Sequence, residues 1–235
     1  MEAVLPADYA HWRQSTLGKT TERIEQDLVL AFAAPLAGKR VLDVGCGDGA
    51  YALSAAERGA QVVGVDTSRE MLEAARERAA SKGLEIDLRE GDVQRLPFDD
   101  ASFDIVLAVT VLCFVEDATE ATREMARVLS PGGRIVIGEL GRFSTWAAWR
   151  RLRGWLGTRT WRGARFRSAG ELARLATAAG LVVERARGAI YYPPVGAIAR
   201  LFVPFDSLPS RITTFGAAFI AVAARKPMSD QGATT

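Results

Sequence analysis

Residues 41–52 read VLDVGCGDGAYA, and this stretch decides the fold. A β-branched run ends in three alternating glycines, Gly45, Gly47 and Gly49, and passes straight into an alanine-rich stretch that favours helix. Glycine lets a backbone pass close to a ligand, and the start of a helix offers free N–H groups. Asp43 precedes the first glycine by two residues, where a carboxylate attracts a ligand ammonium and is less suited to a pyrophosphate. The segment predicts a strand, a ligand-binding loop and a helix. A tight turn without a ligand, with Asp43 capping local N–H groups, is the alternative.

The same alternation continues outward through residues 39–140. Short β-branched runs, RVLDVG, QVVGVD, FDIVLAV and RIVIGEL, are separated by stretches of helical period such as REMLEAARERAASKG. Ser68 and Gly83 suit the N-cap and C-cap of that helix. Residues 19–36 predict a helix before the first strand, and SPGG at 130–133 predicts a turn before the fourth run. The pattern indicates an α/β fold with a mostly parallel sheet and helices on both faces.

Beyond residue 140 the composition changes. Residues 142–167 hold eight arginines, four of the five tryptophans and no acid. A helix is expected at 169–179 and a strand at 181–189, followed by a segment rich in proline and aromatics and by the apolar strand FGAAFIAVAARKP. The expected organisation is a single domain over 1–227, with 1–36 as N-terminal lid and helix, 39–140 as ligand-binding core, 142–167 and 190–215 as insertions, and a disordered tail at 228–235.

Composition excludes several classes of protein. The chain has 235 residues, of which 49% are hydrophobic and 25% charged, as in globular domains and unlike disordered or collagen-like chains. A net charge of +2 argues against a polycation that coats nucleic acid. Cys46 and Cys113 lack CxxC spacing, so neither a disulfide scaffold nor a metal site is expected. The first residues lack the pattern of a signal peptide, and no apolar run reaches the length of a membrane span, so the cytoplasm is the expected compartment.

Two more acids lie where ligands bind in α/β sheets. Asp66 ends the second β-run about twenty residues after the glycines, the place of an acid that accepts hydrogen bonds from a ribose diol. Asp92 follows the third strand, where its carboxylate can accept from an adenine amino group while the Val93 N–H donates to a ring nitrogen. The structural alternatives are a helix-capping role for Asp66 and an Asx-turn at Asp92.

Five motifs stand in order along the chain: VLDVGCGDG, VVGVDTS, GDVQRLPF, FDIVLAVTVLCFVED and RVLSPGGRIVIGEL. On these motifs the sequence resembles the class I S-adenosyl-L-methionine (SAM)-dependent methyltransferases, of the type 11 subgroup that includes ubiquinone- and menaquinone-biosynthesis enzymes. The resemblance is strong over 39–140 and looser over 166–226. It implies a Rossmann-like sheet of seven strands with an antiparallel C-terminal strand and a helical lid. It also implies SAM as cofactor and S-adenosyl-L-homocysteine as product.

The resemblance also implies a contact for each cofactor residue. Gly45, Gly47 and Gly49 would line the methionine and ribose portion of the cofactor, and Asp43 and the Val109 carbonyl would bind the methionyl ammonium. Asp66 would bind the ribose hydroxyls, and the adenine would contact Thr67, Met71, Asp92 and Val93. Thr110 and Leu112 would lie next to the transferring methyl. Many relatives carry a histidine in the dipeptide after that leucine, whereas this chain has Cys113 and Phe114. The departure removes a candidate base.

The acceptor is expected at the carboxyl edge of the sheet, where the N-terminal segment and both insertions converge in this topology. Methyl transfer from a sulfonium depends on in-line positioning, and a base is needed only if the acceptor must lose a proton. His11, the only histidine, is the first candidate base and Tyr9 the second, although both residue types more often pack or face solvent. The candidate substrate contacts are Trp12, Thr110, Glu139, Trp146, Tyr191 and Tyr192.

The arginine- and tryptophan-rich segment 142–167 admits three interpretations. It is a lid helix whose Trp146, Trp149, Leu152 and Leu156 cover the sheet edge, a peripheral membrane element suited to an amphiphilic acceptor, or a site for an acidic solute or nucleic acid. Binding of an acidic solute or nucleic acid has the least support, because the segment is short and the chain as a whole is nearly neutral.

The sequence therefore predicts an enzyme, a SAM-dependent methyltransferase that acts in line on a small organic or lipid-like acceptor. Two alternatives stay open. One is a SAM-binding regulatory module that transfers nothing. The other is a nicotinamide-dependent oxidoreductase, against which the GxGxG spacing and the Asp92–Val93 pair argue.

Overall fold

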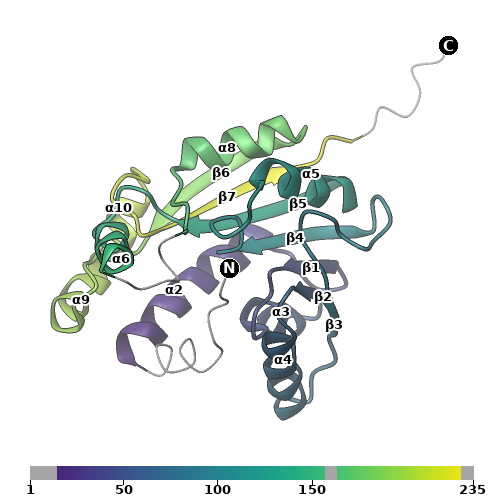
Figure 1. The fold of residues 1–235 in the computed structure, drawn as a ribbon, viewed down its shortest axis with the longest axis horizontal. Coiled ribbons are helices and arrows are strands. Elements are labelled where there is room, and N and C mark those ends of the chain that lie inside the picture. Colours follow the sequence, from purple (N-terminus) through teal and green to yellow (C-terminus); the bar gives the residue numbers. More distant parts are fainter. Residues whose placement is uncertain (1–14, 157–162, 229–235) are drawn as a thin grey trace.

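The computed structural model describes residues 15–156 and 163–228. Seven strands form one sheet in the order β3-β2-β1-β4-β5-β7-β6 (Figure 1). All pairings from β3 across to β5 are parallel, and β7 runs antiparallel to both β5 and β6. The predicted fold class is confirmed. The strands are β1 (Arg40–Val44), β2 (Gln61–Asp66), β3 (Asp87–Glu90), β4 (Phe103–Val109), β5 (Leu129–Leu140), β6 (Val182–Ala189) and β7 (Phe219–Arg225).

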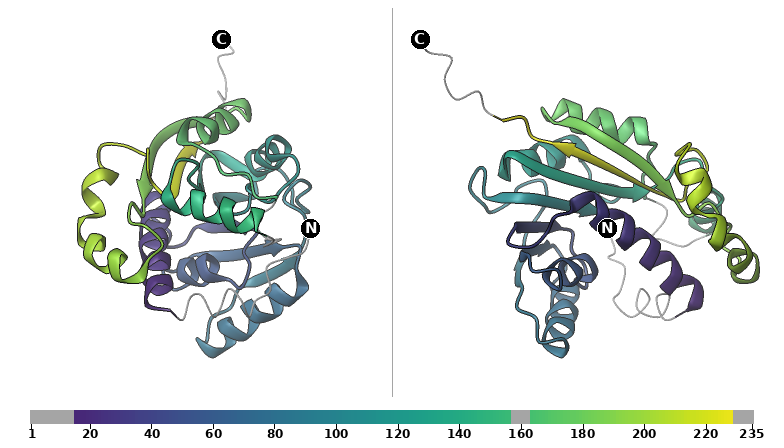
Figure 2. Two further views of the ribbon diagram at one scale, coloured as in Figure 1. Left: turned by 60° about the vertical axis from the view of Figure 1, so that its left-hand side comes forward. Right: turned by 180° about the vertical axis from the view of Figure 1, so that it is seen from behind.

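Helices cover both faces of the sheet, as Figure 2 shows from two sides. They are α2 (Thr16–Ala33), α3 (Ala50–Ala56), α4 (Arg69–Ser81), α5 (Ala118–Val128), α6 (Thr145–Trp155), α8 (Ala169–Ala178), α9 (Gly196–Phe202), the 3₁₀ turn η1 (Val203–Phe205) and α10 (Ser207–Ser210). Strand residues alternate between two cores. Ile105 and Leu107 of β4 pack with α2 and α3, whereas Val106 and Ala108 pack with α5 and α8. Burial on both faces explains the nearly continuous apolar runs in the sequence.

Helix boundaries follow local capping chemistry. Ser68 accepts from the Met71 N–H, so the predicted N-cap is confirmed, whereas the C-cap of α4 is Lys82 and the predicted Gly83, with φ of 63°, is the next residue. The N-terminal helix ends at Ala33, three residues earlier than expected, because Pro35 follows closely and cannot continue it. The predicted turn at 130–133 lies within β5 as an irregularity, where Gly132 has φ of 76° and its N–H donates to the Lys226 carbonyl.

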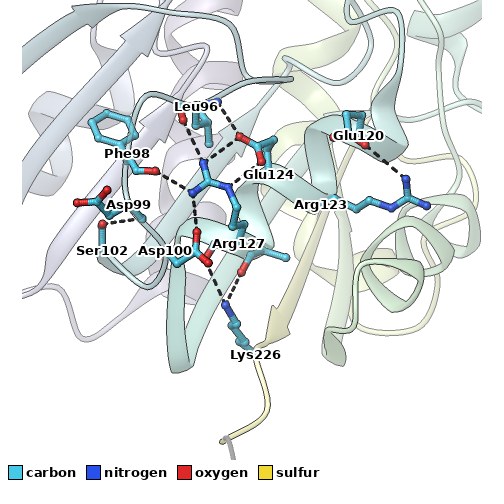
Figure 3. A network of polar contacts seen from close by, with 11 residues as sticks. Leu96, Phe98, Asp99, Asp100, Ser102, Glu120, Arg123, Glu124, Arg127 and Lys226 are labelled. Atoms are coloured by element: carbon cyan, nitrogen blue, oxygen red, sulfur yellow. Dashed lines mark hydrogen bonds and ion pairs between the residues drawn. The ribbon is translucent and has the colours of Figure 1, made fainter.

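A network of hydrogen bonds and ion pairs holds the loop between β3 and β4 in place. The Arg127 guanidinium on α5 donates to the carbonyls of Leu96 and Phe98, at 3.0 and 2.8 Å, and to Asp100 (Figure 3). Glu124, one turn earlier, binds the same guanidinium and accepts from the Leu96 N–H. The network therefore anchors the segment that leads from the expected adenine site back into the sheet.

The expected lid helix forms as α6, but its apolar face is only partly covered. Trp146 is buried, and its indole N–H donates to the Tyr192 carbonyl at 2.8 Å. Trp149, Leu152 and Leu156 are exposed, so the prediction that they cover the sheet edge is wrong. Helical spacing shows which side chains share a face and not whether another element packs on it. Within the described ranges, no helix is long and apolar enough to span a membrane.

Candidate functional site

The glycine loop after β1 lies at the carboxyl edge of the sheet. Gly45, Gly47 and Gly49 all have positive φ, at 62°, 54° and 80°, a backbone region that favours glycine. A Cβ on Gly45 would lie 2.5 Å from Val111 Cγ2 in the loop after β4, whereas nothing lies within 4 Å of the corresponding position on Gly47. The loop therefore packs tightly against the β4 loop at one glycine and faces open space at the next.

Asp43 sits beneath this loop with a free acceptor. Its side chain is 1% exposed, and its Oδ2 atom has no hydrogen-bond partner in the structure. Burial raises the pKa of this carboxyl to about 7, although the Ala52 N–H opposes the shift. A buried acceptor without a partner is costly, and a ligand cation would satisfy it.

Asp66 connects the glycine loop to the next helix. Its Oδ2 accepts from the Gly47 N–H at 2.8 Å, and its Oδ1 accepts from the Ser68 N–H at 2.9 Å. Ser68 itself caps the helix, so Asp66 does not take the helix-capping role and instead bridges the glycine loop and the N-cap residue. Each carboxylate oxygen keeps a second lone pair, so the ribose role stays a prediction that this geometry permits.

An ion pair that the sequence did not reveal clamps the same loop. Arg78 on α4 binds the buried Asp48 carboxylate at 3.0 Å and the Asp48 carbonyl at 2.9 Å. Asp48 lies between two of the loop glycines, so this pair holds the loop against α4. The only signal in the sequence was an acid within the glycine motif.

The expected adenine residues lie along the same edge. Asp92 is exposed, and its Oδ1 accepts from the Gln94 N–H at 2.9 Å, which is the predicted Asx-turn alternative. Val93 and Met71 are buried, and Thr67 is exposed. Their contacts with a cofactor stay predictions.

The loop after β4 is held by side chains beneath it. Thr110 has φ of 56°, an uncommon value outside glycine, and its N–H donates to the Gly138 carbonyl at 2.7 Å. Glu139, which is fully buried, accepts from the Leu112 N–H at 2.7 Å, and Arg167 donates to the Leu112 carbonyl at 2.7 Å. Val109 therefore ends its strand directly before a constrained turn.

Glu139 is positioned to support this loop. Burial raises its pKa to about 7, and Arg167 opposes the shift. Burial also raises the pKa of the Cys113 thiol, with the Glu139 carboxyl adding to the shift. Cys113 is therefore a neutral, buried thiol and no substitute for the missing histidine.

On the side where the acceptor is expected, side chains of α2, α6 and the segment after β6 bond one another. The Tyr192 hydroxyl lies 2.9 Å from Thr21 Oγ1, and Tyr192 is almost fully buried. Tyr191 donates its hydroxyl to the Thr213 carbonyl. These tyrosines, like Trp146, have packing roles here, and their substrate contacts stay predictions. Tyr9, His11 and Trp12 lie outside the described residues.

Glu25, on α2 one turn after Thr21, is a carboxyl that sequence analysis missed. Burial raises its pKa to about 8, while the Arg150 guanidinium from α6 opposes the shift. The charge of Arg150 also opposes the rise in the pKa of Cys113, and the charge of Glu25 contributes to the raised pKa of Tyr192. Glu25 therefore lies close enough to Arg150 and Tyr192 to influence the ionisation of the groups around it. In the sequence it looked like one of several acids on a surface helix.

No cluster of three or more histidine, cysteine or acidic side chains suited to a metal occurs in the part of the chain that the structure describes. The charged groups at this edge are the carboxyls and arginines described above, and they suit a cationic organic ligand held by acids and backbone groups.

Comparisons with known proteins find relatives in one family of enzymes. A family described as "Methyltransferase domain" matches residues 42–137, which include every described cofactor candidate. The chain is 37% identical to a ubiquinone biosynthesis O-methyltransferase from Idiomarina loihiensis, over 69% of this chain and 70% of the relative. It is 47% identical to a demethylmenaquinone methyltransferase from Deinococcus radiodurans, over 43% of each. The chain spans about half the length of several of the curated relatives that it matches.

Solved structures share the fold. A SAM-dependent methyltransferase from Thermotoga maritima superposes with a TM-score of 0.70 at 24% identity, covering 94% of this chain and 95% of that one. A magnesium protoporphyrin IX methyltransferase from Synechocystis, solved with bound S-adenosylhomocysteine, gives a TM-score of 0.66 at 19% identity over 94% and 95%. At these identities the similarity to solved structures establishes the architecture of the chain. The assignment of the site depends on the residues of this chain alone.

Proposed function

Because the chain belongs to the SAM-dependent methyltransferases, we propose that it transfers a methyl group from SAM to a small organic or amphiphilic acceptor at the carboxyl edge of its sheet. The observation that carries the proposal is the unpartnered Oδ2 atom of Asp43, buried beneath a glycine loop that faces open space at Gly47. A buried carboxylate oxygen at that place suits the methionyl ammonium of SAM.

The residues present fit the cofactor. Asp43 would hold the ammonium together with the Val109 carbonyl, the glycine loop would pass along the methionine and ribose, and Asp66 would accept from the ribose hydroxyls. Asp92 and Val93 would meet the adenine. Ligands of open α/β sheets bind beyond the carboxyl ends of the strands, which is where these residues lie.

When bound, SAM supplies an electrophilic methyl on a positively charged sulfur. The chain's own contribution is to orient the reactants and exclude water. Glu139, Arg167 and the strained Thr110 hold the β4 loop in one conformation beside the glycine loop. A preorganised wall of this kind favours in-line approach of the acceptor.

An acceptor that must lose a proton needs a base at the same edge. Glu25, whose pKa burial raises to about 8, is half ionised only in mildly basic solution and is our first candidate among the described residues. His11 and Tyr9 remain candidates from the sequence. Glu139 is fully buried under the β4 loop, so we assign it a positioning role.

The acceptor class is proposed from the relatives. One is named a ubiquinone biosynthesis O-methyltransferase and another a demethylmenaquinone methyltransferase, and both names point to quinone precursors as acceptors. Phenolic quinone precursors are therefore the first acceptors to test. We propose the cytoplasm as the compartment.

The test has two stages. Calorimetric titration with SAM and with S-adenosylhomocysteine should show binding of both, and Asp66→Ala should weaken it by about 2 kcal/mol, since a carboxylate that bonds the ligand is removed. Asp99→Asn, an exposed acid away from the glycine loop, is the matched control. Binding of NAD in place of SAM would contradict the proposal.

The second stage measures transfer. SAM labelled in its methyl group should label a product from phenolic quinone precursors or from a bacterial lipid and metabolite extract. Tight SAM binding with no labelled product from any pool would instead support a regulatory SAM-binding module.

A further inference from the structure

Exposed apolar side chains gather at one end of the molecule. Fourteen large apolar side chains are exposed in the part that the structure describes, and twelve of them belong to residues 143–156 and 195–215. We call these twelve the apolar face. Its members are Phe143, Trp149, Leu152, Trp155, Leu156, Val195, Leu201, Phe202, Phe205, Leu208, Ile212 and Phe215. Soluble monomers rarely expose an apolar patch of this extent without a use for it.

The two segments that carry the face lie side by side. Figures 1 and 2 place α6, α9 and α10 together at the end of the molecule away from the C-terminus. Phe143, just before α6, stacks on Phe215 with ring centroids 5.6 Å apart. Trp146 binds the Tyr192 carbonyl at the base of the second segment. The face is therefore one continuous feature formed by two distant parts of the sequence.

The exposed charges within the two segments that carry the face are positive. Arg151, Arg153 and Arg211 are exposed among its apolar members. The only acid within 141–156 and 190–216 is Asp206, which is 8% exposed and accepts from the N–H groups of Ile190 and Tyr191. The face thus presents cations and apolar groups, with its one carboxylate turned inward.

We propose that the apolar face docks on the surface of an anionic lipid bilayer. Tryptophan, phenylalanine and leucine side chains settle at the boundary between headgroups and acyl chains, while arginines bind anionic headgroups. Trp155 and Ile212 are the most exposed members, at 83% and 87%, and they extend furthest from protein packing. A second copy of the chain would bring like charges together, which disfavours self-association through this face.

The docked orientation also bears on the acceptor, a point that rests on the proposed methyl transfer. The segment before α6 leaves β5 at the carboxyl edge, and the segment after β6 leaves at the same edge. A bilayer bound to the apolar face therefore borders the opening where the acceptor is expected. An amphiphilic acceptor would reach the site without crossing bulk water.

Vesicle binding tests the proposal without SAM or acceptor. The whole chain is mixed with vesicles of phosphatidylglycerol and phosphatidylcholine, or of phosphatidylcholine alone, and the bound fraction is measured by flotation. We expect binding to the anionic vesicles that weakens at least about tenfold between about 0.1 M and about 0.5 M salt. Absence of binding to anionic vesicles at low salt would overturn the proposal.

Matched variants locate the surface. Trp155→Glu with Ile212→Glu should reduce vesicle binding at least about tenfold, whereas Val182→Glu, an exposed apolar residue on β6, should leave it unchanged. Arg151→Glu with Arg153→Glu should act like the first pair, and Arg58→Glu with Arg187→Glu, exposed arginines elsewhere, should have less effect. Equal binding by all variants would overturn the assignment.

Two further outcomes are distinguishable. A dimer in light scattering that Trp155→Glu dissociates, with no vesicle binding, would show that the face binds a second copy and would refute the lipid proposal. Vesicle binding by a chain that transfers no methyl group would uphold this inference and refute the proposed function alone.

Discussion

The buried carboxyl of Asp43 should make SAM binding depend on pH. In the folded chain burial raises the pKa of this group to about 7, so it is largely protonated in mild acid. The methionyl ammonium of a bound SAM would favour the ionised carboxylate, because an opposite charge nearby stabilises it. Binding should then release the proton, and affinity should rise as the pH rises toward neutrality.

The size of the effect follows from the pKa. If only the ionised form binds, the apparent Kd is multiplied by one plus the ratio of protonated to ionised Asp43. With a pKa of about 7 this factor is about 33 at pH 5.5 and about 2 at pH 7. The affinity should therefore increase about 16-fold over this range, which is about 1.6 kcal/mol.

Calorimetry measures both parts of the prediction. Titrations of SAM at several pH values between about 5.5 and about 7 give the Kd, and two buffers with different ionisation enthalpies give the number of protons released. Asp43→Asn should bind SAM more weakly at neutral pH and lose most of the pH dependence, whereas Asp99→Asn should behave as the wild type. A wild-type Kd that is constant over this range, or an Asn variant that keeps the wild-type slope, would refute the role of Asp43.

Three further predictions concern the framework of the site. Burial raises the pKa of Glu139 from 4.5 to about 7, so the contribution of its protonated carboxyl to stability is complete below about pH 4.5 and is lost as the pH rises through 7. Glu139→Gln should therefore flatten the decline of Tm between about pH 5 and 8. An unchanged slope of Tm against pH would contradict this prediction. Gly45→Ala should lower stability by about 2 kcal/mol or more, because its Cβ meets Val111; Val111→Ala in the same chain should recover part of the loss, while Gly47→Ala should cost only about 1 kcal/mol. Arg127→Ala should cost about 2 to 3 kcal/mol in chemical denaturation, since it leaves two loop carbonyls and Glu124 without their donor, and a loss under about 0.5 kcal/mol would mean that the loop is held otherwise.

Most of the fold was predictable because its signals are local. Strands appear as β-branched runs, and helices begin at side chains such as Ser68 that cap their own first turn. The turn expected before the strand at residues 130–133 lies inside β5 instead: these residues stand between Leu129 and Arg134, which pair with β4, and Lys226 bonds the backbone of Gly132 and Gly133. A contact from the C-terminal segment, which no local signal reveals, thus extends the strand through these residues.

The candidate site was predictable to the extent that it follows strand ends. Asp43 and Asp66 were found because parallel strands bring their carboxyl ends to one edge. The clamp from Arg78 to Asp48 was missed because its partners lie thirty residues apart and resemble surface charges in the sequence. The exposure of Trp149 was missed for a related reason, since periodicity does not say what packs on a face.

The place of β7 in the sheet also constrains the order of folding. This strand is the last in the described part of the chain, yet it pairs with β5 on one side and β6 on the other. In the described chain β6 has no other strand partner, so it cannot join the sheet before β7 arrives. During synthesis, from the N-terminus onward, the edge of β5 stays open while the parallel half of the sheet can already form. Non-local pairing of this kind is slow, and an unpaired edge invites association with other chains. Until β7 docks, the unpaired edge of β5 therefore leaves this protein open to association with other chains.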